Sequence, residues 1–190
     1  MSTPKQSSRS ASPSASVTAA AAKQGAQRGA KRGAAPVAEK GATAAAKQID
    51  GFIAKFDPTI AKEIRACRAL LRKRFPTANE IVYDNYNFFV IGYCSTLRSS
   101  DCIVSVAANS KGVGLSFYWG STLPDPHKIL LGSGTQNRFV RLPTPETLSD
   151  PKVSALIDAA VAQAKVPLAI GKRGVSIVKS ISTKQRPRRA

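Results

Sequence analysis

Two alternating apolar runs flank a loop in residues 112–142, GVGLSFYWGSTLPDPHKILLGSGTQNRFVRL. Positions 115, 117 and 119 carry large apolar side chains, whereas positions 114, 116 and 118 carry Gly, Ser and Tyr. This alternation predicts a strand whose two sets of side chains point to opposite faces. Residues 138–142 are predicted to form a further strand. The loop between the runs contains the turn-forming residues Pro124, Pro126, Gly132 and Gly134, and a short helical piece is expected over residues 127–131.

Three more strands are predicted before this region. The segments EIVYD (80–84) and NFFVIGY (87–93) are rich in β-branched and aromatic residues and are separated by a polar break. Residues 102–108 alternate, and the following Asn-Ser-Lys-Gly is typical of a hairpin turn. Such short connections favour antiparallel pairing of consecutive strands.

Helices are predicted on both sides of these strands. Apolar residues follow helical spacing over residues 49–56 and 60–75, and a third helix is expected from Asp150-Pro151 to Ala164. Residues 175–181, VSIVKSI, are a candidate last strand that either completes this sheet or pairs with a second copy of the chain. The prediction is an α+β fold with a mainly antiparallel sheet of about five strands, packed by two N-terminal helices and one C-terminal helix.

The formal net charge of +18 is concentrated at the two ends of the chain. Eight Lys or Arg and one Glu in residues 1–48 give +7, and eight basic residues with no acid in residues 165–190 give +8. The residues between them contribute only +3. We therefore expect a disordered Ala/Lys/Arg-rich tail (1–46), an α+β domain (47–165) and a basic C-terminal extension that contains the candidate last strand (166–190).

The basic ends are candidates for contact with the phosphates of DNA or RNA without reading sequence. The alternative is that these charges are solvated and have no specific partner. The cations expected to make phosphate contacts are Lys23, Arg28, Lys31, Arg32, Lys184, Arg186, Arg188 and Arg189.

The three cysteines and one histidine are too few, at their spacing, for a zinc site or a disulfide framework. We expect Cys67, Cys94 and Cys102 to be small buried residues of a cytoplasmic protein. The N-terminal residues lack the apolar core of a signal peptide, and no apolar run reaches the ~20 residues that cross a bilayer. Their Ser- and Arg-rich composition leaves an organelle transit peptide open, and monomer and homodimer are both open.

No arrangement of residues points to catalysis. A nucleophilic triad is not expected, because the chain has one imidazole and lacks the G-x-S-x-G turn. Aromatic residues beside small loop residues instead suggest a shallow pocket for a flat or phosphorylated ligand, with core packing or a plain loop position as the alternative for each residue. Arg138 and Arg141 are expected on opposite faces of their strand and not as one clamp. The candidate ligand contacts are Tyr86, Tyr118, Trp119, His127, Ser133, Gly134 and Arg138.

Several motifs within residues 49–164 carry a resemblance to a known family: LPDP (123–126), LLGSG (130–134), RFVRL (138–142) and the helix after Asp150-Pro151. EIVYDNYN and IVKSISTKQRPRR resemble markers of one branch of it. The chain is thus similar to the YdhG-like bacterial domains of unknown function, and the resemblance implies an α+β sheet packed by helices. One Gram-positive member type is described as a frataxin-like intracellular iron chaperone, so the resemblance also implies iron as a candidate cargo.

Iron binding of that kind needs clustered carboxylates. The two predicted N-terminal helices carry Asp50, Asp57 and Glu63 among seven Lys or Arg. We therefore expect a small cytosolic, non-catalytic binding or accessory domain of unassigned ligand. Non-specific nucleic-acid association through the tails and frataxin-like iron chaperoning are the alternatives.

Overall fold

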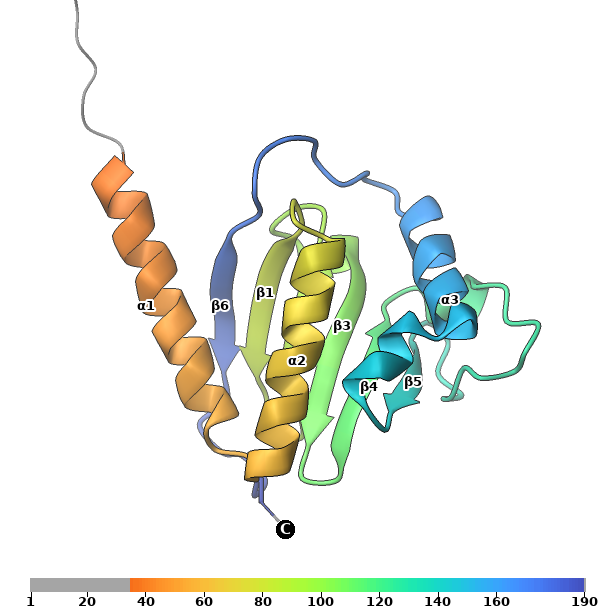
Figure 1. Cartoon of the computed structure of the whole chain (residues 1–190), viewed down its shortest axis with the longest axis horizontal. Coiled ribbons are helices and arrows are strands. Elements are labelled where there is room, and N and C mark those ends of the chain that lie inside the picture. Colours follow the sequence, from red (N-terminus) through yellow and green to blue (C-terminus); the bar gives the residue numbers. More distant parts are fainter. Residues whose placement is uncertain (1–34, 190) are drawn as a thin grey trace, which may run out of the picture. The chain divides into compact units, whose positions relative to one another are not determined.

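The computed structural model describes residues 35–189. Within this range the chain forms three α-helices and one six-stranded sheet (Figure 1). The predicted α+β class is confirmed, with six strands where about five were expected. The helices are α1 (Ala35–Ile53), α2 (Pro58–Arg74) and α3 (Pro151–Ala162). The strands are β1 (Asn79–Asp84), β2 (Phe89–Cys94), β3 (Cys102–Asn109), β4 (Gly112–Phe117), β5 (Arg138–Leu142) and β6 (Ser176–Ile181).

The strands lie side by side in the order β5-β4-β3-β2-β1-β6. β1 to β5 follow one another as antiparallel neighbours, as their short connections predict. β6 lies on the outer side of β1 and runs parallel to it, with Ile177 opposite Ile81. The candidate last strand therefore completes its own sheet. The basic C-terminal extension belongs to the same structural unit as the other described residues.

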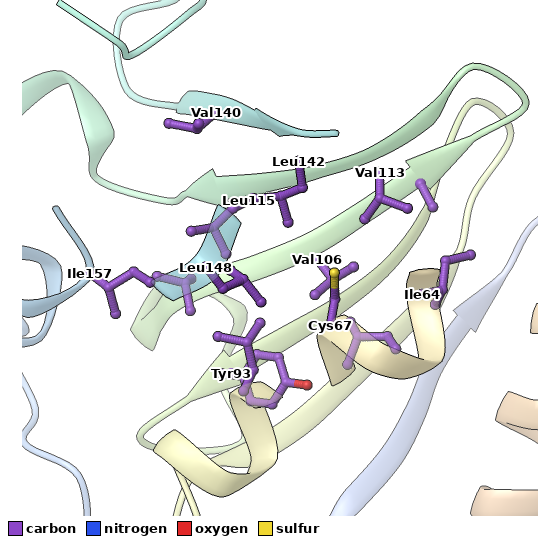
Figure 2. Close-up of a cluster of buried hydrophobic side chains, with 14 of the residues drawn as sticks. Ile64, Cys67, Tyr93, Val106, Val113, Leu115, Val140, Leu142, Leu148 and Ile157 are labelled. Carbon is purple, nitrogen blue, oxygen red and sulfur yellow. The ribbon is translucent and has the colours of Figure 1, made fainter. Parts of the chain in front are cut away.

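The three described helices cover one face of the sheet (Figure 1). Every second residue of the central strands faces them and is buried, as Val104 and Val106 of β3 and Leu115 of β4 illustrate. Side chains of α2 and α3, among them Cys67 and Ile157, complete this core (Figure 2). Each large apolar side chain that is fully buried here contributes about 1.5–3 kcal/mol through the hydrophobic effect.

Prolines determine where two of the helices begin, as the sequence predicts. α2 begins at Pro58 and α3 at Pro151, positions where a helix does not need the backbone N–H that proline lacks. The carboxylate of Asp150 also accepts a hydrogen bond from the N–H of Lys152 at 2.8 Å and so caps α3. α1 begins at Ala35, earlier than predicted, so part of the segment expected to be a disordered tail is helical.

Residues 127–131 are not helical, contrary to the prediction. The carboxylate of Asp125 accepts hydrogen bonds from the N–H groups of Ile129 at 3.1 Å and Leu130 at 2.8 Å. Lys128, just before Ile129, has a φ of 52°, which a right-handed helix excludes. A side chain that competes for the backbone donors therefore replaces the helix with a turn.

Glu80 of β1 is a fully buried carboxylate, 0% exposed, on the side of the sheet that faces the helices. Arg68 of α2 donates from Nε and Nη2 to its two oxygens at 3.0 and 2.8 Å. Arg72 lies 3.7 Å from the same carboxylate, and Ser176 of β6 donates to it at 2.6 Å. Glu80 thereby connects β1 to α2 and to β6.

Asp84, at the other end of β1, is a second buried carboxylate. Its two oxygens contact Lys55 at 2.7 Å and Arg188 at 3.0 Å. Arg188 is itself only 5% exposed, and it also donates to the carbonyl groups of Asn85 and Asn87. Asp84 therefore holds the connection between α1 and α2 and the C-terminal segment at the same point of the sheet.

The environment of Glu80 controls its ionisation. Burial alone would raise the pKa of Glu80, but hydrogen bonds from Arg68 and Ser176, together with the charge of Arg72, hold its pKa below the ordinary value. The ionised carboxylate therefore stabilises the fold at pH values above the pKa of the unfolded state. This stabilisation is lost as the pH falls through the lower pKa of the folded state.

We expect Glu80→Gln to lower the free energy of unfolding at pH 7 by about 3 kcal/mol, because two partly buried arginines lose their counter-charge. The difference from wild type should shrink below about pH 4.3, where the unfolded wild-type chain begins to bind the proton. Urea unfolding across pH 7 to pH 3 measures both effects. Asp158→Asn, which removes an exposed pair with Arg74, is the control and should cost less than about 1 kcal/mol. A difference for Glu80→Gln that does not change with pH would contradict this account.

Candidate functional site

The face of the sheet opposite the helices carries a cavity of about 1100 Å³. Most of its lining comes from the strand residues that alternate with those of the core, because successive side chains of a strand point to opposite faces. The lining also includes Ile60 and Glu63 of α2 and the core residues Val113 and Leu142. We call this surface the open face. Its lining residues from the strands include Tyr83, Val90, Gly92, Cys94, Cys102, Ser105, Ala107, Gly114, Ser116, Phe139 and Arg141.

Small residues form the floor of the open face. The strand register places Gly92, Ser105 and Ser116 in one row across β2, β3 and β4. A neighbouring row contains Ala107 and Gly114. Since these side chains are short, a bound molecule can approach the backbone of the central strands closely.

Larger side chains stand at both sides of this floor. The first row ends in Phe139 on β5, and the second has Tyr83 on the β1 side. Tyr118, just beyond β4, packs edge-on against Trp119 with ring centroids 5.2 Å apart. Phe88, in the turn before β2, also lines the cavity. The open face is therefore a trough with aromatic walls and a floor of small residues.

The charged residues in the lining are Arg141, Lys111 and Glu63. Arg141 lies opposite Gly114 on β5, and Lys111 is in the turn that joins β3 to β4, so both cations are at the same end of the sheet. Polar side chains add hydrogen-bonding groups; Asn137, for example, donates to the hydroxyl of Ser116 at 2.7 Å. This end of the trough therefore offers positive charge beside an apolar and aromatic surface.

Of the candidate ligand contacts predicted from the sequence, Tyr118 lines the open face. Trp119 lies beyond the end of β4 and lines a far smaller pocket of about 10 Å³, where its Nε1 donates to the carbonyl of Ser100 at 3.3 Å. Tyr86 is exposed in the turn between β1 and β2, with the guanidinium of Arg186 5.6 Å from its ring centroid. Trp119 thus contacts Tyr118 but does not line the open face, and Tyr86 does not line it either.

The loop that follows η2 (Gly120–Thr122) also contributes less than predicted. His127, Ser133 and Gly134 are exposed in this loop and do not line the cavity. Arg138 donates to the carbonyl groups of Gly134 and Asn137, so it braces its own loop. As predicted, Arg138 and Arg141 do not act as one clamp, and it is Arg141 that lines the open face.

The strand residues of the open face that were not predicted share a pattern in the sequence. In β3 and β4 the positions between the buried aliphatic residues are occupied by Ser105, Ala107, Gly114 and Ser116. A run of small residues on the non-core face of neighbouring strands predicts a hollow surface. The position of Phe139 and Tyr83 at its sides depends on strand register, which the sequence does not reveal.

Of the C-terminal cations predicted to contact phosphates, Arg188 is buried and the other three are exposed. Arg188 is buried against Asp84 and lies 5.6 Å from the ring centroid of Phe56, so it is not available to bind phosphate in this structure. Arg189 is exposed and donates to the carbonyl of Ala54, and Lys184 is exposed. The N-terminal candidates lie outside the described residues; these are Lys23, Arg28, Lys31 and Arg32.

Within residues 35–189 no group of three or more His, Cys, Asp or Glu residues is placed to hold a metal ion. Glu80 and Asp84, the buried carboxylates of β1, are already paired with cations. No helix in the described part of the chain has the length and apolarity that crossing a membrane requires.

The position of Arg188 predicts a role in stability. We expect Arg188→Ala to lower the free energy of unfolding by about 3 kcal/mol. The substitution removes a buried counter-charge of Asp84 and leaves the carbonyl groups of Asn85 and Asn87 without the hydrogen bonds that Arg188 donates. Arg186→Ala, at an exposed position of the same segment, should change it by less than about 1 kcal/mol. Urea unfolding of both variants at pH 7 measures the difference. Equal effects of the two substitutions would show that the buried ion pair does not fix the C-terminal segment.

Comparison with known proteins adds no family to these observations. No protein-family model, no curated protein and no solved structure matches the chain. The likeness to YdhG-like domains therefore rests on the sequence motifs alone.

Proposed function

We propose that this protein is a small cytoplasmic, non-catalytic binding domain that holds a flat anionic organic molecule on the open face of its sheet. The observation that carries the proposal is the trough itself, with its floor of Gly92, Ala107 and Gly114, its aromatic walls and its two cations at one end. Ligand sites in proteins are typically concave and mostly apolar, with a few polar groups that fix orientation.

The shape of the trough favours a flat molecule. The rings of Tyr83 and Phe139 stand on opposite sides of the floor. Residues with short side chains form this floor on three neighbouring strands. A planar ring system laid on this floor contacts backbone below and aromatic side chains at its edges. Aromatic pairs of this kind contribute about 0.5–1.5 kcal/mol beyond the effect of buried area.

The charge of the trough favours an anion. The lining contains two cations, Arg141 and Lys111, and one carboxylate, Glu63, so positive charge is in excess. The guanidinium group of arginine presents donors in a planar fork that matches carboxylate, sulfonate or phosphate oxygens. Arg141 is exposed, so it can reorient toward a bound anion.

Two other functions remain proposals with less support from the described residues. Nucleic-acid binding through the basic ends is still supported by the positive charge of residues 1–48. Arg188 does not add to it, because it is paired with the buried carboxylate of Asp84. Iron chaperoning rests on the resemblance to YdhG-like domains. The buried carboxylates Glu80 and Asp84 are neutralised by arginine and lysine, which leaves them no role in such binding.

Two fluorescent probes that differ in one charge test the proposal on the full chain: anilinonaphthalene sulfonate and the uncharged phenylnaphthylamine. We expect Ala107→Phe to weaken binding of both probes by about tenfold or more, because the new ring fills the floor of the trough. Arg141→Gln should weaken the sulfonate by about two- to fivefold and leave the neutral probe unchanged, since an exposed ion pair contributes at most about 1 kcal/mol. Fluorescence titration measures both affinities.

Matched controls are available on the exposed surface of α2. Ala69→Phe and Arg65→Gln make the same chemical changes at exposed positions away from the trough. Both should bind the two probes as the wild type does, with unchanged circular dichroism in all four variants. If Ala107→Phe binds both probes with wild-type affinity, or if Arg65→Gln matches Arg141→Gln, the open face is not the binding site.

A further inference from the structure

Cys94 of β2 and Cys102 of β3 are neighbours on adjacent strands of the open face, at the end remote from Arg141. The strand register makes them direct antiparallel partners. Both side chains line the cavity although little of either residue is exposed. Ile81 packs with them in a small cluster that is separate from the main core.

The two sulfur atoms converge because Gly92 lies between them. A Cβ atom placed on Gly92 would lie 2.9 Å from the Sγ of Cys102 and 3.5 Å from the Sγ of Cys94. The two thiols are near enough for each to shift the pKa of the other. Regular antiparallel partners have Cα atoms about 4.5–5.5 Å apart, within the ~4.4–6.8 Å range that a disulfide spans. The register shifts between Tyr93 and Cys94, which alters this spacing locally, but both sulfur atoms lie against Gly92.

The surroundings of the pair make Cys102 the nucleophile. The hydrogen bond from the Cys94 thiol lowers the pKa of Cys102, burial opposes this effect, and the hydroxyl of Ser105, 3.3 Å from the Cys102 sulfur, lowers the pKa further. The same coupling and burial raise the pKa of Cys94. Of the two, Cys102 is therefore the group that reacts as a thiolate, and Cys94 remains the neighbouring thiol.

Cys67 provides an internal contrast. It is 0% exposed in the core between α2 and the sheet (Figure 2). Burial, followed by the charges of Glu63 and Glu146, raises the pKa of Cys67 to about 12. A thiol in this position is inert toward oxidants, because the thiolate is the reactive species.

We propose that Cys94 and Cys102 are a redox-active dithiol that closes to an intramolecular disulfide in the floor of the open face, with a low-molecular-weight disulfide as oxidant. The Cys102 thiolate attacks one sulfur of the oxidant, which releases one small thiolate and forms a mixed disulfide. Cys94 then loses its proton and attacks the Cys102 sulfur, which releases the second small thiolate. The protein loses two protons and two electrons, and the oxidant becomes two thiols. This modification does not depend on which molecule occupies the trough.

The test uses the folded full chain and oxidised glutathione. After incubation, the protein is quenched in acid, denatured, alkylated and analysed by mass spectrometry. We expect two of the three thiols to become resistant to alkylation, and the mass of the oxidised chain before alkylation to be about 2 Da below that of the reduced chain. Trypsin cleaves after Arg98, between the two cysteines, so the disulfide should join two separate peptides that reduction releases.

Two variants separate the steps. In Cys94→Ser, Cys102 has no partner and should retain glutathione as a stable mixed disulfide, whereas Cys67→Ala should form the same cross-link as the wild type. Three alkylatable thiols after oxidation of the wild type would overturn the proposal. A disulfide that involves Cys67, or a wild-type product that consists only of glutathione adducts or covalent dimers, would overturn it as well.

Discussion

The buried carboxylates of β1 are the constraint on which the arrangement of the fold depends. Glu80 and Asp84 point toward the helices, where an unpaired charge would cost several kcal/mol, so each must be met by cations. Arg68 of α2 neutralises the first, and Lys55 and Arg188 neutralise the second. One short strand thereby fixes the position of a helix, of the connection between two helices and of the C-terminal segment.

This arrangement has a consequence for the other face of the sheet. The described helices lie together on one face of the sheet (Figure 1), which is the side of Glu80 and Asp84. The trough is on the opposite side. A sheet face that packs against nothing is usually rich in polar side chains. Here the central strands carry small residues such as Ala107 and Gly114 between aromatic neighbours. The same surface combines the features of a ligand site with a pair of adjacent thiols, and Gly92 takes part in both.

Much of this fold is predictable because its local signals are strong. The starts of α2 and α3 at Pro58 and Pro151 follow from proline and capping chemistry, and the faces of β4 follow from alternation. The parallel pairing of β6 with β1 is a contact between distant segments, which no local pattern encodes. Arg188 was predicted to contact phosphates, with a solvated end as the alternative, because an arginine in a charged run gives no sign that it is paired with a buried carboxylate.

The candidate site was predicted only in part, for a related reason. Alternation placed Tyr118 on the correct face, but the loop with His127 was expected to line the pocket, whereas the lining of the cavity comes mainly from the strands. Which residues meet across neighbouring strands depends on register. Register placed Phe139 beside Ser116 and brought Cys94 to Cys102.

The most direct test of the central claim, that the open face is the binding surface, is a titration of the isotope-labelled full chain with anilinonaphthalene sulfonate, followed by two-dimensional amide NMR. The account predicts that the signals that shift belong to the open face and include Gly92, Ala107, Gly114 and Ser116. Signals of α2 residues on the opposite side, such as Cys67, should stay in place. Shifts centred on the helices, or spread evenly through the core, would contradict it.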